Sequence, residues 1–197
     1  KVTCTKSNEG FATAGGVQYV ACAGNFKDAG LEYTGALKVL QMIFSYEYLW
    51  IQIRVKGGAY GCMCSFSDQG DSMFVTYRDP NLSESYKVYD EAADYVVDFD
   101  ADDRDMKKYI IGTIGSMDMP MEAVDMGARS FHAYFLGKTE ADLQKVRDQV
   151  LSCTQEDIRA LAPIVKAVVE AGNRCCIGNE EKIDQNKEYF DEVKHVL

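Results

Sequence analysis

The 197-residue chain is 47% hydrophobic and 26% charged, a balance that excludes disordered and collagen-like proteins. Its formal net charge of −10 argues against nonspecific binding to nucleic acid or anionic lipid, because the field repels phosphates, and it favours basic partners. The length predicts one domain, residues 1–197, and no apolar stretch reaches the roughly 20 residues needed to cross a bilayer.

The first elements in chain order are a predicted strand and a long helix. Residues 17–26 are rich in small and β-branched side chains, which is typical of a buried strand. Thr34 is a candidate N-cap for an apolar helix over residues 35–50. Residues 51–56 alternate like a strand, yet they continue the helical run and place two cations near its C-terminus, so we interpret them as helix.

A hairpin follows the long helix. Gly57 and Gly58 are expected to end the helix, as glycine after a last turn commonly does. Residues 59–66 and 72–78 alternate with period two around the turn SDQGD, which predicts an antiparallel hairpin closed by Pro80.

The second half of the chain is mostly helical in pattern. We expect a helix that Ser83 caps and that runs to about Phe99. Further helices are expected from Asp102 or Asp103 to about Ile114, from Pro120 to Gly137, and after the capping signatures at Thr139 and Thr154, with a break at Pro163. Residues 173–178 predict a short strand, and residues 188–196 a terminal amphipathic turn or two of helix. This order predicts an α+β fold with a mostly antiparallel sheet and helices packed on one face.

Metal chemistry is not expected on this chain. His132 and His195 are its only histidines, and neither lies in H-E-x-x-H or H-x-x-E-H. The acidic run from Asp98 imitates a calcium loop, but Asp103 stands where the loop needs glycine and Tyr109 where it needs glutamate. We therefore predict no metal ligands and a solvated acidic stretch.

The cysteines predict free thiols. They are odd in number, seven, and Cys62 and Cys64 fall on one strand face instead of in a C-x-x-C knuckle. Buried, unpaired cysteines, here including Cys175 and Cys176, are typical of a reducing compartment. No serine or cysteine has a base in an ordered triad, and no phosphate-binding glycine motif is present.

The stretch RVKGGAYG, residues 54–61, leaves two interpretations open. One is purely structural, with a helix end, two turning glycines and a strand start. In the other, Arg54 and Tyr60 donate to one peptide carbonyl across the glycine hinge, because a guanidinium and a phenol both donate without a pKa shift. Tyr60 alternates in phase with apolar Cys62, so we expect its phenol either to face the core or to be turned outward by a bulge at Gly61.

Several motifs of this chain, taken together, resemble those of one protein family. Residues 48–96, with RVKGGAYG and the hairpin-closing YRDPNL, and the tail GNEEKIDQNKEYF resemble the last domain of the presequence-protease branch of the insulinase and pitrilysin zinc peptidases. The likeness covers nearly the whole chain, and the combination is more specific than any one motif. The start at Lys1 in place of methionine fits a piece of a longer chain.

The resemblance implies a clam shell of four similar α+β domains that degrades unfolded peptides, with basic ones favoured by the acidic charge. Its first domain carries H-x-x-E-H, whose zinc activates water. Its last domain supplies an arginine and a tyrosine, here Arg54 and Tyr60, which hold the substrate backbone and stabilise the oxyanion. Zinc would therefore be bound elsewhere, and this piece alone would be an inactive part of a zinc metalloendopeptidase.

Three further expectations accompany the resemblance. A peptide is expected to bind at a sheet edge near residues 17–26 by adding as a strand. A catalytically inactive scaffold or peptide-binding module of the same superfamily remains the alternative function. Bacterial cytoplasm is the expected location, with an organellar matrix as the alternative.

Overall fold

The computed structural model describes residues 5–196, in which six strands form one mixed sheet in the order β3-β4-β2-β5-β1-β6. The strands are β1 (Glu9–Thr13), β2 (Tyr19–Asn25), β3 (Gly61–Phe66), β4 (Asp71–Tyr77), β5 (Asn173–Asn179) and β6 (Glu192–His195). Pairing is antiparallel from β3 through β4 and β2 to β5, and parallel from β5 through β1 to β6. The hairpin β3–β4 and the strands β2 and β5 confirm the predictions for those segments.

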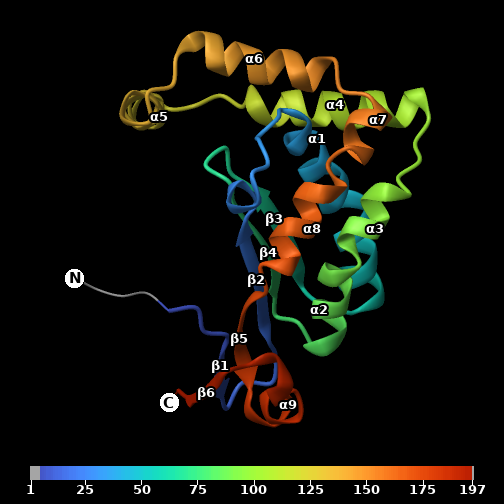
Figure 1. Ribbon diagram of the computed structural model, residues 1–197, viewed down its shortest axis with the longest axis vertical. Helices are drawn as coiled ribbons and strands as arrows, with labels where there is room; N and C mark the ends of the chain where they lie inside the picture. Colours follow the sequence, from blue (N-terminus) through green and yellow to red (C-terminus); the bar gives the residue numbers. More distant parts are fainter. Residues whose placement is uncertain (1–4, 197) are drawn as a thin grey trace.

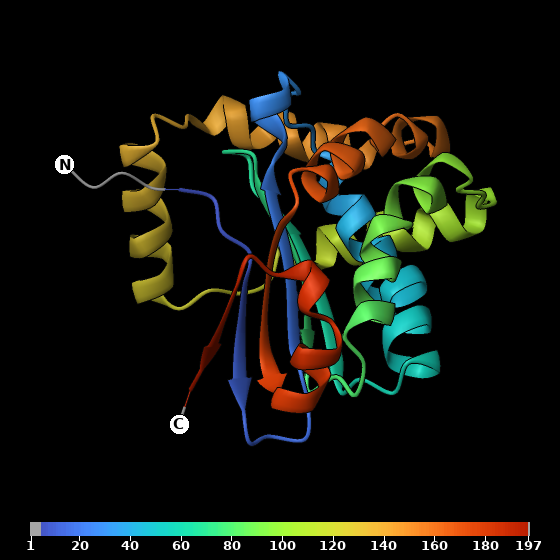
Figure 2. The ribbon, with the colours of Figure 1, turned by 60° about the horizontal axis from the view of Figure 1, so that its bottom comes forward.

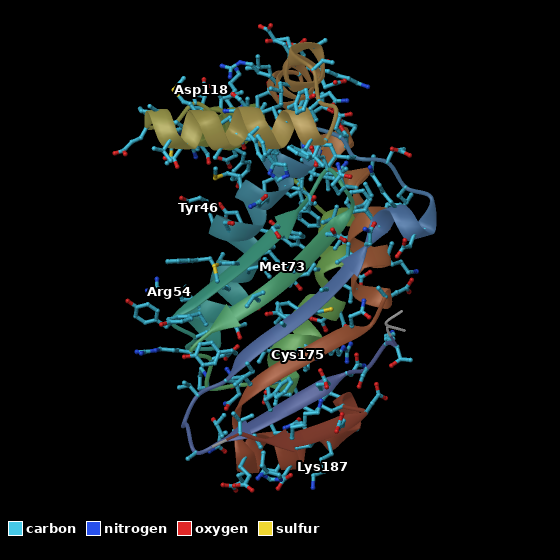
Figure 3. All side chains as sticks on the ribbon, turned by 90° about the vertical axis from the view of Figure 1, so that its left-hand side faces the viewer. Tyr46, Arg54, Met73, Asp118, Cys175 and Lys187 are labelled. Atoms are coloured by element: carbon cyan, nitrogen blue, oxygen red, sulfur yellow. The ribbon has the colours of Figure 1, made fainter. Side chains whose placement is uncertain are left out.

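The helices lie mainly on one side of this sheet (Figure 1). They are α1 (Ala36–Ile43), α2 (Ser83–Asp90), α3 (Ala92–Val97), α4 (Asp103–Met117), α5 (Ala123–Phe135), α6 (Glu140–Leu151), α7 (Gln155–Arg159), α8 (Ala162–Glu170) and α9 (Glu180–Gln185). Figure 2 shows α5 standing apart from the other helices. Figure 3 views the opposite side, where the strands are seen directly without a helix in front of them. The predicted α+β class with helices on one face is confirmed. Among the described residues, no helix has the length and apolar content to cross a bilayer.

The core lies between the helices and the sheet. Phe74 of β4 and Val20 of β2 are fully buried in one hydrophobic cluster with Leu40 of α1 and Val165 of α8. Because side chains alternate along a strand, the residues between the buried ones point to the opposite side of the sheet. We call that side the open face, and Met73 and Cys175 mark it in Figure 3.

Helix starts depend on local capping, and the predictions were right for some and wrong for others. Thr139 and Thr154 each form a complete capping box, and Pro163 falls at the start of α8, where it ends the preceding helical run. Ser83 is wrong as a cap, because Leu82 occupies that position and the Ser83 hydroxyl donates to Glu84.

Thr34 is also wrong as a cap. Gly35 holds the N-cap position of α1 without a side-chain bond, and its N–H donates to the Gln149 side chain at 2.8 Å. A Cβ on Gly35 would lie 2.5 Å from the Val146 carbonyl oxygen of α6. The start of α1 is therefore determined by close contact with α6, which local sequence does not reveal.

The helix predicted at residues 188–196 is wrong. A single 3-10 turn, η4 (Lys187–Tyr189), leads into β6, which pairs in parallel with β1. The Lys194 ammonium forms an ion pair with Glu9 and lies 5.7 Å from the centre of the Phe11 ring. Pairing with β1, distant in sequence, therefore decides the conformation of this segment.

The sheet edge expected near residues 17–26 is also wrong. β2 lies inside the sheet, with β4 on one side and β5 on the other. Its backbone groups are already paired along both sides, so no peptide strand can add there. The edge strands are β3 and β6.

A buried carboxylate, Asp79, joins the hairpin to α2. Its Oδ2 accepts a hydrogen bond from the Ser85 hydroxyl at 2.6 Å, and its Oδ1 accepts one from the Asn81 N–H at 2.9 Å. The Asp79 backbone exchanges two hydrogen bonds with Gln18, of 2.7 and 2.8 Å. Burial raises the pKa of this carboxyl, although the hydrogen bonds from Ser85 and Asn81 act in the opposite direction. The segment YRDPNL is thus fixed to the sheet.

Replacing Asp79 with alanine should destabilise the chain by about 1–3 kcal/mol, because the buried Ser85 hydroxyl then loses its acceptor. Urea unfolding followed by circular dichroism measures the free energy. Asp98→Ala, at an exposed site after α3, is the matched control and should change it by less than about 0.5 kcal/mol. Equal losses in both variants would contradict this role of Asp79.

Candidate functional site

The candidate site begins at a wide helical turn. The segment after α1 is helical, as predicted, but residues Phe44–Tyr48 (η2) and Trp50–Lys56 (η3) have the i to i+5 hydrogen bonds of a π-helix. At its end the Gly57 N–H donates to the Gln52 carbonyl at 3.1 Å. π-helical turns are rare and frequently occur at functional sites.

Gly57 and Gly58 connect this helix to β3, and each position requires glycine for a different reason. A Cβ on Gly57 would lie 2.5 Å from the Ile53 carbonyl oxygen, so no larger residue fits there. Gly58 has a φ of +80°, in the left-handed region that glycine adopts without strain. The expected helix end at these glycines is confirmed.

Arg54 is held at this turn by two contacts. Its guanidinium carbon lies 4.1 Å from the centre of the Trp50 ring, and its Nε donates to the Tyr60 carbonyl at 2.9 Å. Within residues 5–196 the two terminal nitrogens of Arg54 have no hydrogen-bond partner and no carboxylate pairs with them. Figure 3 shows Arg54 at the border of the open face, beside the start of β3. The guanidinium is therefore fixed in place, and its two terminal nitrogens can donate hydrogen bonds to a ligand.

Tyr60 lies outside the core. Its side chain is 68% exposed, and its ring packs edge-to-face on Tyr77 with the centroids 5.8 Å apart. The pairing of β3 with β4 runs without interruption from Gly61–Tyr77 to Phe66–Ser72, so the bulge predicted at Gly61 is wrong. Tyr60 precedes the first paired residue of β3, so the alternation of side chains along the strand does not fix the direction of its ring.

The surroundings of the pair are cationic although the chain as a whole is acidic. Lys56 is exposed two residues after Arg54, and Arg78 lies across from Tyr60, whose N–H donates to the Arg78 carbonyl at 3.2 Å. Arg78 has a φ of +49°, a strained conformation for a residue with a side chain. Its guanidinium lies 5.7 Å from the Tyr77 ring. The site therefore favours electron-rich atoms such as carbonyl oxygens.

The cysteines do not supply a nucleophile. The six cysteines of the described residues are all free, as predicted, but the burial expected for Cys62 and Cys175 is wrong, because both are only half-buried. Cys4 lies outside the described residues. Burial raises the pKa of the Cys62 thiol to about 11, although the nearby Arg54 charge lowers it. Since the thiolate is the reactive form, Cys62 is protonated and inert at neutral pH.

Zinc does not fit on the described part of this chain. No three His, Cys, Asp or Glu side chains in residues 5–196 lie close enough together to hold a metal ion. His132 is on α5. The Nδ1 of His195 lies 3.3 Å from the Oε1 of Glu180, and β6, which carries His195, is at the opposite edge of the sheet from β3. The chemistry available at the candidate site is hydrogen-bond donation by Arg54 and Tyr60.

Sequence reasoning missed two supporting residues. Trp50 lies four positions before Arg54, a spacing that places side chains together on a helix. Tyr77 lies opposite Gly61 when the hairpin is counted back from its turn. Both signals are present in the sequence, but neither stands out without the structure.

Comparisons with known proteins agree on one family. The PreP C-terminal domain family matches residues 8–179. Protein HypA of Clostridium perfringens is 43% identical over 192 residues, covering 98% of this chain and 20% of that protein. Presequence protease 1, chloroplastic/mitochondrial, of Arabidopsis thaliana is 34% identical over 194 residues, covering 96% of this chain and 18% of that protein. The chain therefore spans about a fifth of these curated relatives.

Solved structures show the same fold at low identity. A peptidase M16 inactive domain from Pseudomonas fluorescens superposes with a TM-score of 0.61 at 14% identity, covering 90% of this chain and 44% of that one. At this identity the likeness supports the fold alone.

Trp50 is the only tryptophan, so its fluorescence reports on Arg54. Arg54→Ala should shift the emission maximum to longer wavelength, because water then reaches the ring face that the guanidinium covers. Lys56→Ala removes an exposed cation two residues away and should leave the emission unchanged. An unchanged spectrum in Arg54→Ala would mean that the two side chains do not stack in solution.

The reaction of Cys62 with iodoacetamide should depend on pH in the way its raised pKa dictates. At pH 8 about one Cys62 in a thousand is thiolate, and the rate should keep rising up to about pH 11 instead of levelling near the ordinary value. Peptide mass spectrometry of the alkylated chain follows the reaction. The urea-unfolded chain is the control and should react with the ordinary thiol profile.

Proposed function

Because this chain belongs to the PreP C-terminal domain family, we propose that residues 1–197 form the C-terminal substrate-binding domain of a zinc-dependent metalloendopeptidase that degrades unfolded peptides. The observation that carries the proposal is the pairing of an exposed Tyr60 with an Arg54 whose terminal nitrogens are free within the described residues. Two donors, held by contacts that leave their N–H and O–H groups available, suit a peptide carbonyl.

The proposed role of the pair is electrostatic. Arg54 donates through its terminal nitrogens and Tyr60 through its hydroxyl to the substrate backbone and to the oxyanion that develops during cleavage. This role requires no proton transfer to or from either group. Since zinc does not fit on residues 5–196, the metal and the attacking water belong to another part of the parent enzyme. This chain alone is expected to be inactive.

The substrates proposed are unfolded peptides, enclosed in a chamber formed with the other domains of the parent enzyme. The net charge of −10 favours basic peptides through long-range attraction, while the local cations at Arg54 and Lys56 face the backbone carbonyls. Nucleic acid and membrane are not proposed as partners, because the same field repels phosphates. We place the parent enzyme in bacterial cytoplasm, with an organellar matrix as the alternative, on the basis of the free thiols.

The second candidate function is an inactive scaffold or peptide-binding module of the same superfamily. Two structures that share the fold at 14% identity are described as inactive peptidase domains, so the fold by itself is compatible with this function. The pair of an exposed Tyr60 and a half-buried Arg54 favours the enzyme, since a scaffold has no use for a fixed guanidinium whose terminal nitrogens have no partner among residues 5–196.

In the full-length parent enzyme, Arg54→Ala and Tyr60→Phe should each lower kcat/KM by roughly 10²–10³, the usual cost of one oxyanion donor. Peptide cleavage assays measure this, and metal analysis should find the zinc content unchanged.

The matched controls for this experiment are Arg104→Ala, an exposed arginine at the start of α4, and Tyr46→Phe, an exposed tyrosine of η2. Both should retain the unmodified kcat/KM. Normal kinetics in Arg54→Ala and Tyr60→Phe would reject the proposal, and a parent chain without cleavage activity would favour the scaffold.

A further inference from the structure

A single row of side chains crosses the open face of the sheet from strand to strand. Strand register pairs Gly61 with Tyr77, Tyr19 with Ile177, and Ile177 with Phe11. Ring contacts complete the row, because Tyr60 packs on Tyr77 at 5.8 Å and Tyr77 packs on Tyr19 at 5.4 Å. We call Tyr60, Tyr77, Tyr19, Ile177 and Phe11 the apolar row.

The apolar row faces outward. Tyr77, Tyr19 and Ile177 are 39%, 37% and 46% exposed, whereas their neighbours along the strands, such as Thr76, Val20 and Cys176, are buried under the helices. Large apolar side chains in a continuous exposed line mark an interaction surface more often than scattered ones do.

We propose that the apolar row is a second substrate-binding surface, which takes aromatic or large apolar side chains of an extended peptide whose backbone is held at Arg54 and Tyr60. This inference rests on the proposed function. An extended peptide is the expected ligand of the row because the row is continuous with the donor pair, since Tyr60 belongs to both. A peptide bound at the pair therefore meets Tyr77 first and Tyr19 next.

The charged residues at the two ends of the row also favour an extended peptide as its ligand. The near end of the row is bordered by the cations Arg54, Lys56 and Arg78, which attract carbonyl oxygens. At the far end Lys194 forms ion pairs with Glu9 and Glu192, which leaves one carboxylate in excess for a basic side chain. The row thus suits a peptide that is apolar in its middle and basic at its far end.

The dimensions of the sheet determine at which substrate positions the apolar row can favour a large apolar side chain. Neighbouring strands lie about 4.8 Å apart, so the row from β3 to β1 extends about 19 Å, which an extended peptide covers in about six residues. The face of a sheet offers no free backbone groups, because these are paired between strands. Selection there depends on side chains and falls on residues up to about six positions from the cleaved bond.

The test uses the full-length parent enzyme and peptides of one length with a single cleavable bond. The peptides carry either Phe or Ala at each position from about three to six residues from that bond. At one or more positions Phe should lower KM about threefold to tenfold with little change in kcat, which is the contribution of one aromatic contact.

Two variants and a matched control examine the row itself. Tyr19→Thr and Ile177→Thr place a residue of high strand propensity at each position and should remove most of the Phe advantage. Met73→Thr changes an exposed residue of the same face that lies outside the row, and it should keep the advantage.

Equal KM for Phe and Ala peptides at every position would overturn the inference, as would a Phe advantage that survives in both row variants. Loss of thermal stability in the row variants with an unchanged Phe advantage would also overturn it, since the row would then pack against another domain of the parent enzyme. The proposed function is judged separately by Arg54→Ala and Tyr60→Phe. If these two lower kcat/KM while the row variants do nothing, only the inference about the row fails.

Discussion

The hydrogen bond from Arg54 to the Tyr60 carbonyl is the interaction on which the candidate site depends. It joins the last turn of a π-helix to the residue that precedes β3, so two donors from different elements keep a fixed spacing. The bond forms only because the intervening glycines let the chain reverse tightly, one by lacking a Cβ and the other by its left-handed backbone. Trp50 then covers one face of the guanidinium and limits its motion.

Much of the fold could be predicted wherever the signal is local. The hairpin turn, the capping boxes at Thr139 and Thr154 and the helix end at Gly57 each follow from a few adjacent residues. β1 and β6 could not be predicted in the same way, because short strands are stabilised by partners more than 150 residues away in the chain. The π-helical hydrogen bonds also escaped prediction, since the same apolar pattern fits an α-helix.

The candidate site shows the same division between local and distant information. Arg54 and Tyr60 were identified from their motif, but the direction of the Tyr60 ring depends on which residue pairs with Gly61, and the alternation pattern gave two possible answers. The apolar row could not be predicted from the sequence, because it is defined only when the registers of three strand pairs and the contact between Tyr77 and Tyr19 are known together. Residues that look like ordinary strand side chains one at a time become a surface by alignment across the sheet.

The strand order has a consequence for how the chain is made. β1 and β2 are consecutive in the sequence, yet β5 lies between them and β6 covers the outer side of β1. During synthesis β1 therefore has no partner strand until β5, more than 150 residues later in the sequence, has been made. Such late closure leaves unpaired backbone exposed for seconds and makes nascent chains vulnerable to aggregation. Chaperone contact during translation would be most valuable over this N-terminal strand.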